Sequence, residues 1–281
     1  MKIGGIIPTI RPDKKIKIIW DLVIILIISL YFYIIPMQLS FDMFYDDELE
    51  YFFQKHYVNP SLASFLVIFP EMLLIIDTLL KFITGFYENG IVIEDKISII
   101  HHYLRTGLVF DILSYLPVLV QSIMKQVFPQ IMEILKFFQL LMFFKIKRVK
   151  MAIFNYEEII ASNGKHDFLL TFCKMMYVII FITHLNACIW HAIAYFNPGV
   201  SWLDFNGFRQ DYWTERYIYS FYWAISMFAT IGFGEKISPR NCIECMMGGL
   251  ILIISVLLIG YCINSMKQLL DMMSVQENEY K

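Results

Sequence analysis

Charged side chains are scarce in this sequence of 281 residues: Asp, Glu, Lys and Arg together make up 17% of it, whereas hydrophobic residues make up 58%. Soluble globular domains carry about 25% charged residues, so this composition favours the lipid bilayer as the solvent. The net charge of -2 gives no large excess of one sign. The sequence therefore offers no general attraction for a polyanion, and we expect no nucleic-acid partner.

Cysteine is also rare, with five residues, and its spacing does not build a metal site. Cys242 and Cys245 form a C-x-x-C pair, but no second cysteine pair or nearby histidine pair completes the four ligands of a structural zinc site. The sequence also has no nucleophile constellation and no nucleotide-binding loop. We therefore expect no cofactor, and we expect that the chain is not an enzyme.

The segment 1–17 lacks a secretory cleavage pattern, and the apolar stretch after it is too long for a signal peptide. The first helix is therefore expected to stay in the mature chain. Basic residues in this segment leave a mitochondrial presequence open, although Asp13, Pro8 and Pro12 weaken that interpretation. We favour the plasma membrane, with the mitochondrial inner membrane as the alternative.

A bilayer core of about 30 Å is crossed by about 20 mostly apolar helical residues. Segments of that length and composition predict an all-α membrane protein with six transmembrane helices. These segments cover residues 18–39, 62–86, 97–123, 130–150, 168–196 and 242–272. Basic residues gather before the first segment and after the fourth, whereas five acids crowd the loop after the first, so both termini are expected on the cytoplasmic side.

Residues 221–235 read FYWAISMFATIGFGE, and they begin within an apolar segment, 216–230, that is too short to span and leads into Gly232 and Gly234. Such a segment is typical of a re-entrant helix that lines a pore. A dehydrated potassium ion needs a cage of oxygens, which four copies of an extended strand supply with backbone carbonyls. Thr230 adds a hydroxyl, and Gly232 and Gly234 permit backbone angles that point carbonyls toward the axis. An ordinary glycine turn would leave the aromatic half-helix and the threonine unexplained.

The run Thr-Ile-Gly-Phe-Gly after an aromatic half-helix resembles the signature of potassium channels of the voltage-gated-like superfamily. THLNACIWHAI at 183–193 and SWL at 201–203 are similar to the ether-à-go-go and cyclic-nucleotide-gated branch. The resemblance implies that potassium, the permeant ion, is bound by the carbonyls of residues 230–233, and that Glu235 makes the outer mouth negative. The implied selectivity filter consists of Thr230, Ile231, Gly232, Phe233 and Gly234.

Ionisable residues at membrane depth are costly and usually face partners inside a helix bundle. The second and third predicted spans contain three acids, Glu71, Asp77 and Asp111. The resemblance implies that they are counter-charges for a basic fourth helix, although Leu74 replaces the aromatic residue expected three positions before Asp77. Acids that lie near an interface and face water are the alternative.

The fourth segment departs from a voltage sensor, which needs Arg or Lys at every third position so that each charge crosses the field, at about 2.3 kcal/mol per 100 mV. The stripe reads Lys136, Gln139, Met142, Lys145 and Arg148. Its three basic residues are the candidate sensor charges. The inner ones can also form a solvated anchor that obeys the positive-inside rule. We expect weak or absent voltage dependence.

These observations divide the chain into a cytoplasmic N-terminus (1–17), a voltage-sensor-like four-helix domain (18–150), a linker (151–167), a pore domain (168–272) and a short C-terminal tail (273–281). Gly260 in the last span is the candidate gate hinge, because glycine lets a pore-lining helix bend. With so short a tail, we expect no cyclic-nucleotide-binding domain.

The predicted function is that of a potassium-selective channel subunit, which conducts passively through a homo- or hetero-tetrameric pore surrounded by membrane lipid. The first alternative keeps the fold without conduction: a channel-derived structural subunit of a larger membrane assembly. The missing sensor charges motivate it, but the intact filter argues against it. A secondary transporter is a second alternative, and the sequence lacks the paired interrupted helices that it needs.

Overall fold

The computed structural model describes residues 9–41, 60–88, 91–124, 136–150, 167–197, 199, 201–232 and 237–279. In these ranges the regular secondary structure is helical apart from one two-stranded hairpin. It divides into two compact units, and the first long helix contributes to both of them. The first unit comprises Met1–Ile35 and Asp47–Ile153, and the second comprises Pro36–Asp46 and Phe154–Lys281.

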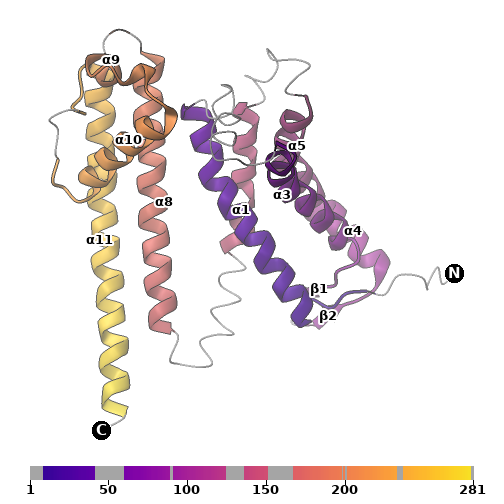
Figure 1. Ribbon diagram of the computed structural model, residues 1–281. Helices are drawn as coiled ribbons and strands as arrows, with labels where there is room; N and C mark the ends of the chain where they lie inside the picture. The colour runs from indigo at the N-terminus through magenta and orange to yellow at the C-terminus, as the bar shows by residue number, and fades with distance from the viewer. Residues whose placement is uncertain are drawn as a thin grey trace. The chain divides into compact units, whose positions relative to one another are not determined.

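The first unit is a bundle of helices with a small hairpin at one end (Figure 1). Its elements are α1 (Lys15–Phe41), α3 (Pro60–Lys81), β1 (Phe86–Glu88), β2 (Ile91–Ile93), α4 (Lys96–Thr106), α5 (Leu108–Met124) and the 3-10 helix η1 (Gln139–Lys145). The strands are antiparallel, with Phe86 opposite Ile93. A bridge between Ile10 and Thr84 holds the chain before α1 beside the hairpin.

Helix α1 is apolar on all sides but buries only one of them. Ile24 and Ile28, one turn apart, are fully buried, whereas Leu22 and Leu26 on another side are 47% and 62% exposed. An exposed leucine face of this extent would be unfavourable in water, but it suits a helix that contacts acyl chains. The expected first span, 18–39, agrees with α1.

The predicted third span, 97–123, is wrong as one continuous helix, because the chain breaks at Gly107 between α4 and α5. Gly107 ends α4, and its N–H donates to the carbonyl of Tyr103. A Cβ at this position would lie 2.9 Å from the Tyr103 ring, which is closer than side chains tolerate. The predicted second span, 62–86, is also too long at its C-terminal end, since α3 ends at Lys81 and the strand β1 begins at Phe86.

Only residues 136–150 of the predicted fourth span, 130–150, are described, and their centre is the 3-10 helix η1. A 3-10 helix has three residues per turn, so side chains three apart lie on the same face. Gln139, Met142 and Lys145 are accordingly all buried. The three middle positions of the predicted stripe therefore face the interior of the first unit.

The second unit consists of two long helices, a short helix between them and a connecting loop with two small helices (Figure 1). Its elements are α8 (Asp167–Phe196), α9 (Trp202–Phe205), the 3-10 helix η2 (Phe208–Gln210), α10 (Trp213–Phe228) and α11 (Cys242–Glu279). Helix α10 packs against both α8 and α11. At 16 residues it is about 24 Å long, less than a bilayer core.

Tryptophan side chains form the core of the second unit. The rings of Trp190 on α8 and Trp223 on α10 stack with their centroids 3.7 Å apart, and Trp202 on α9 stacks at 6.4 Å from Trp190. All three are fully buried. The last turn of α1 joins this unit, because Phe41 stacks on His191 with centroids 3.8 Å apart. These contacts fix the short helix α10 against α8.

In the described part of the chain, three helices are long and apolar enough to cross a membrane: Lys15–Phe41, Thr171–Phe196 and Cys242–Asp271. They correspond to the first, fifth and sixth predicted spans. A shorter apolar helix, Leu108–Pro117, lies within α5.

Candidate functional site

The first three residues of the predicted filter follow directly on the end of α10. Helix α10 stops at Phe228, and the N–H groups of Ile231 and Gly232 both donate to the carbonyl of Ser226, at 3.0 and 3.3 Å. Thr230 donates its N–H to Met227. The carbonyls that end the helix are thus used by the next residues, and the chain leaves the helix in a tight reversal.

Two of these residues have a left-handed backbone. Thr230 has φ 56° and Gly232 has φ 65°. Threonine rarely adopts this conformation, and residues held in it carry strain of about 1–3 kcal/mol that clusters at functional sites. A Cβ at Gly232 would meet nothing within 4 Å, so glycine is required there by its backbone angle rather than by space. Thr230, Ile231 and Gly232 are all exposed in the single chain.

The other predicted filter and mouth residues, Phe233, Gly234 and Glu235, lie outside the described residues. Gly260 lies within the continuous helix α11, where a Cβ would meet nothing within 4 Å. Its role as a hinge stays a prediction.

A buried glutamate that the sequence analysis missed ties the loop to the start of α11. Glu244 is fully buried and accepts hydrogen bonds from the backbone N–H groups of Trp202, at 3.2 Å, and Arg240, at 2.7 Å. A carboxylate in the first turn of a helix also interacts favourably with the helix dipole. Glu244 therefore joins α9, α11 and the segment before α11.

An ion pair between Arg209 and Asp204 links the loop to the end of α8. The Arg209 guanidinium donates to both carboxylate oxygens of Asp204, at 2.5 and 3.0 Å, and to the last carbonyls of α8, at Ala194 and Tyr195. Hydrogen bonds from Arg209 hold the pKa of Asp204 well below its ordinary value near 3.8, and the same carboxylate raises the pKa of Arg209. We call this pair the loop clamp.

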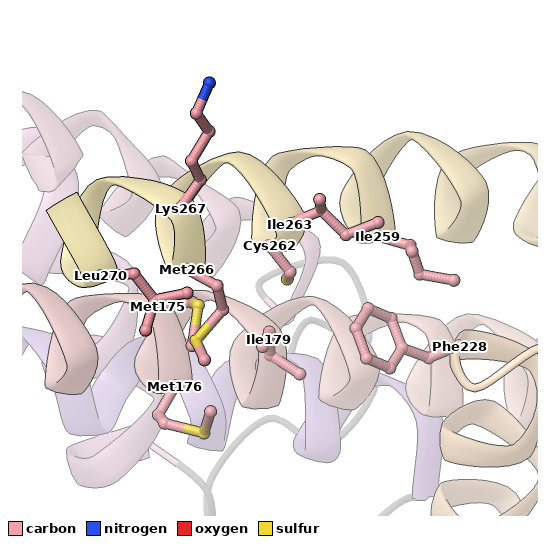
Figure 2. Close-up of a pocket in the computed structure, with 10 residues that line it drawn as sticks. All are labelled: Met175, Met176, Ile179, Phe228, Ile259, Cys262, Ile263, Met266, Lys267 and Leu270. Carbon is pink, nitrogen blue, oxygen red and sulfur yellow. The ribbon is translucent and has the colours of Figure 1, made fainter.

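An apolar groove of about 630 Å³ lies between α8 and α11 beneath the end of α10 (Figure 2). Met175 and Met176 line it from α8, Met266 lines it from α11, and Phe228, the last residue of α10, lines it at one end. The Lys267 side chain points away from it (Figure 2). Because Phe228 lies two residues before Thr230, the groove borders the base of the candidate filter.

In the first unit, Asp77 pairs with Arg148. This acid is 1% exposed, and the Arg148 guanidinium donates to its two oxygens at 2.5 and 3.0 Å. The indole N–H of Trp20 donates to the same carboxylate, and Arg148 also reaches Asp21 on α1 at 3.2 Å. Bidentate Arg–carboxylate pairs are among the strongest hydrogen-bonded contacts in proteins. Arg148 is thereby held by both α1 and α3.

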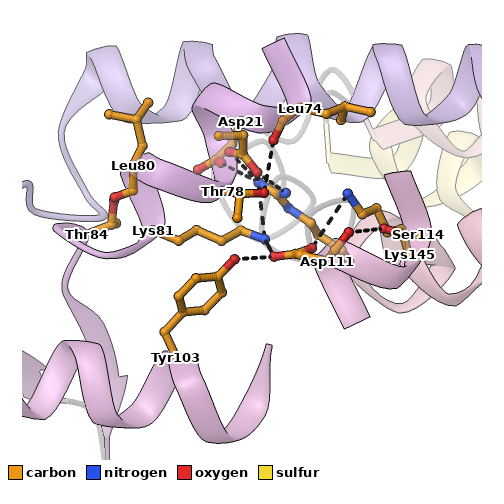
Figure 3. Close-up of polar contacts among 12 residues, drawn as sticks. Asp21, Leu74, Thr78, Leu80, Lys81, Thr84, Tyr103, Asp111, Ser114 and Lys145 are labelled. Atoms are coloured by element: carbon orange, nitrogen blue, oxygen red, sulfur yellow. Dashed lines mark hydrogen bonds and ion pairs between the residues drawn. The ribbon is translucent and has the colours of Figure 1, made fainter. Parts of the chain in front are cut away.

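Asp111 on α5 is the centre of a second set of contacts (Figure 3). Lys81 donates to it at 2.5 Å, the Tyr103 hydroxyl donates at 2.7 Å, and Lys145 lies 3.6 Å away. Lys81 also lies 3.7 Å from Asp77, so it links the two acids. We call these residues, with Asp21 and Arg148, the charge cluster.

The structure thus brings four of the predicted sensor residues together as two pairs: Asp77 with Arg148, and Asp111 with Lys145. Glu71 is also buried, but it lies about 9 Å earlier along α3, where Tyr31 is its electrostatic neighbour. Lys136 is half-buried at the start of the described fourth segment.

Three members of the charge cluster were missed from the sequence: Asp21, Lys81 and Tyr103. Two carried a usable signal. Lys81 follows Asp77 by four residues, a spacing that brings helical side chains together. Asp21 is an ionisable residue within the first apolar run, which alone predicts a buried partner. Tyr103 carried no such signal, because its contact with Asp111 depends on the break at Gly107.

Long apolar helices, a short helix that ends in a left-handed turn, and paired buried charges define an integral membrane protein. The family of ion transport proteins matches this chain over residues 17–276, and the chain belongs to that family. Membership confirms the resemblance to voltage-gated-like channels. It also confirms the expectation that the chain is not an enzyme, since the family consists of ion transport proteins.

The proteins with similar sequences include cation channels and potassium channels. The chain is 26% identical over 172 residues to the cyclic nucleotide-gated cation channel of Ictalurus punctatus, covering 58% of this chain and 22% of the relative. It is 24% identical over 200 residues to potassium channel AKT1 of Arabidopsis thaliana, covering 69% and 22%. It is 26% identical over 200 residues to potassium channel KAT3 of Oryza sativa subsp. japonica, covering 69% and 39%. The chain thus spans well under half the length of these relatives.

Removal of one partner from the buried pair is expected to destabilise the first unit strongly. Asp77→Asn leaves the Arg148 charge without its bidentate partner, at a cost of about 3–5 kcal/mol. The double variant Asp77→Asn with Arg148→Gln should recover part of this loss, because neither charge is then buried alone. Thermal unfolding of the full chain in lipid nanodiscs measures both effects.

The matched control is the exposed pair of Arg11 and Glu94 in the same unit, whose side chains are 58% and 39% exposed. Glu94→Gln should change stability by less than about 1 kcal/mol. Equal losses for Asp77→Asn and Glu94→Gln would contradict the described burial of the charge cluster.

The loop clamp predicts a specific response to acid. Because folding lowers the pKa of Asp204, the stabilisation from the clamp is complete above pH 4 and is lost as pH falls through the lowered pKa. Tryptophan fluorescence, to which the adjacent Trp202 contributes, should therefore stay constant from pH 7 to pH 4 and change only below. Asp204→Asn should abolish the acid transition. A transition near pH 6 in the unaltered chain that Asp204→Asn removes would refute this assignment.

Proposed function

We propose that this chain is a subunit of a potassium-selective channel, which conducts passively through a pore formed by four copies. The observation that carries the proposal is the turn after α10, in which Thr230 and Gly232 both have a positive φ and the segment 230–232 is exposed. Backbone carbonyls of such an exposed segment can replace the water shell of an ion once copies of the chain surround an axis.

The assignment of the two units follows from this role. The second unit would be the pore domain (168–272), with α10 as the re-entrant helix and α8 and α11 as its two spans. The first unit would be the four-helix sensor-like domain (18–150), in which α3, α5 and the fourth segment join α1 and bring the number of spans to six. Glu235 would concentrate cations at the outer mouth, and Gly260 would be the hinge of an inner gate.

The charge cluster supports weak voltage dependence. The fourth segment presents neutral Gln139 and Met142 where a sensor needs charges, and both are buried. Lys145 and Arg148 already contact Asp111 and Asp77. If the segment moved, the next positions of the stripe would offer the acids no cation, so the segment is expected to remain fixed.

Conduction is tested with the purified full chain. Its mass in nanodiscs should correspond to four copies, and it should pass potassium in preference to sodium in vesicles. Gly232→Asp should abolish the flux without loss of the tetramer, because it introduces a charge and a strained side chain into the filter. Gly249→Ala is the control, since a Cβ there would meet nothing within 4 Å, and it should retain flux. One copy bound among unrelated subunits, without flux, would instead indicate the structural alternative.

Voltage dependence is tested by restoration of the missing charges. Gln139→Arg combined with Met142→Arg should make channel opening depend more steeply on voltage, because each charge that crosses the field adds about 2.3 kcal/mol per 100 mV. Leu140→Arg, on the exposed side of η1, is the matched control and should add nothing. The test is to record current over a range of voltages. A steep dependence of channel opening on voltage in the unaltered chain would overturn the proposed loss of voltage sensitivity.

A further inference from the structure

Helix α4 is too short and too polar to cross the bilayer. Its 11 residues extend about 16 Å, about half of a bilayer core. They include Lys96, Arg105 and two histidines, His101 and His102. The break at Gly107 separates α4 from the apolar helix α5, so the two helices need not share one axis.

Two different apolar faces run along α4. Ile99 and Tyr103 are buried within the first unit. Ile97, Ile100 and Leu104 are instead exposed, at 76%, 41% and 47%. At 100° per residue these three side chains fall within an arc of about 60°. We call them the α4 stripe.

Basic side chains border the α4 stripe on both sides. Lys96 lies before it around the helix, and His101 and Arg105 lie after it. The acids closest in sequence are already engaged: Asp95 caps α4 by accepting from Ser98, and Glu94 pairs with Arg11. The cations at the border of the stripe therefore have no neighbouring carboxylate on α4 itself, since α4 contains no acid.

We infer that α4 lies in the plane of the membrane surface, with the α4 stripe among acyl chains and Lys96 and Arg105 on the headgroups of anionic phospholipids. An apolar stripe flanked by Lys and Arg is the arrangement of helices that bind such surfaces, where lipid phosphates complement the cations. The bridge between Ile10 and Thr84 holds the hairpin beside the start of α1, on the side where basic residues are concentrated. That side is the predicted cytoplasmic leaflet.

This lipid contact reaches the charge cluster. Tyr103 lies on the buried side of α4, and its hydroxyl donates to Asp111 at 2.7 Å. A bound lipid surface would therefore fix the orientation of a side chain that contacts the acid. The inference requires only an integral membrane protein and is independent of conduction, so absent flux would leave it intact.

The depth of α4 is measured on the full chain in nanodiscs of phosphatidylcholine and phosphatidylglycerol. A fluorescent amino acid is introduced at Leu104 or, as control, at Thr106, about 160° around the helix. A nitroxide attached to the lipid acyl chain near the headgroup should quench the fluorescence of the probe at Leu104 several-fold more than that of the probe at Thr106. Equal quenching at the two positions, or a probe at Leu104 that is exposed to water, would overturn the inference. A probe at Leu104 that is shielded from water but is not quenched by the lipid nitroxide would also overturn it, because it would indicate contact with a protein partner or a second copy.

The headgroup contact is measured by native mass spectrometry of lipids retained by the same full chain. Lys96→Gln with Arg105→Gln should lower the ratio of retained phosphatidylglycerol to phosphatidylcholine several-fold. Lys96→Arg with Arg105→Lys preserves the charge and should preserve the ratio. An unchanged ratio in the Gln variant would overturn the headgroup contact. If that variant fails to fold, the depth measurement, which leaves both cations in place, still decides where α4 lies.

Discussion

Within a bilayer, a charge without a partner is far more costly than in water, and this constraint organises the first unit. Asp77 and Asp111 lie on different helices and are both buried. Each can stay ionised because cations from other segments reach it: Arg148 at Asp77, and Lys81 with Lys145 at Asp111. The ion pairs therefore set which faces of α3, α5 and the fourth segment meet.

The same constraint acts on backbone groups in the second unit. A helix that ends inside a membrane protein leaves unpaired carbonyls, which need donors. Arg209 supplies them at the end of α8, and the N–H groups of Ile231 and Gly232 supply them at the end of α10. The hydrogen bonds at the end of α10 produce the turn on which the proposed filter depends. The same hydrogen bonds therefore cap the helix and reverse the direction of the chain.

The sequence predicted the features that depend on local pattern. Apolar length located α1, α8 and α11, and the filter motif located the end of α10. It could not predict the break at Gly107, because the apolar run continues through this residue and the steric reason lies in the Tyr103 ring. It also missed Glu244, whose burial depends on backbone donors of Trp202 and Arg240. Those contacts exist only once the loop has folded.

The charge cluster also supports the proposed weak voltage dependence of a chain that carries basic residues in its fourth segment. The cluster holds three acids, Asp21, Asp77 and Asp111, and three cations, Lys81, Lys145 and Arg148. A fourth cation, Lys17 on α1, lies 2.6 Å from Asp21. Lys81 belongs to α3 itself, so one cation stays near both acids wherever the fourth segment lies. Inward movement of the fourth segment would separate Arg148 from Asp77 and Asp21 together, and it would bring the neutral side chains of Met142 and Gln139 toward the acids. The electrostatic cost of that step exceeds what a single charge gains from the membrane field, at about 2.3 kcal/mol per 100 mV, because a broken buried pair costs about 3–5 kcal/mol.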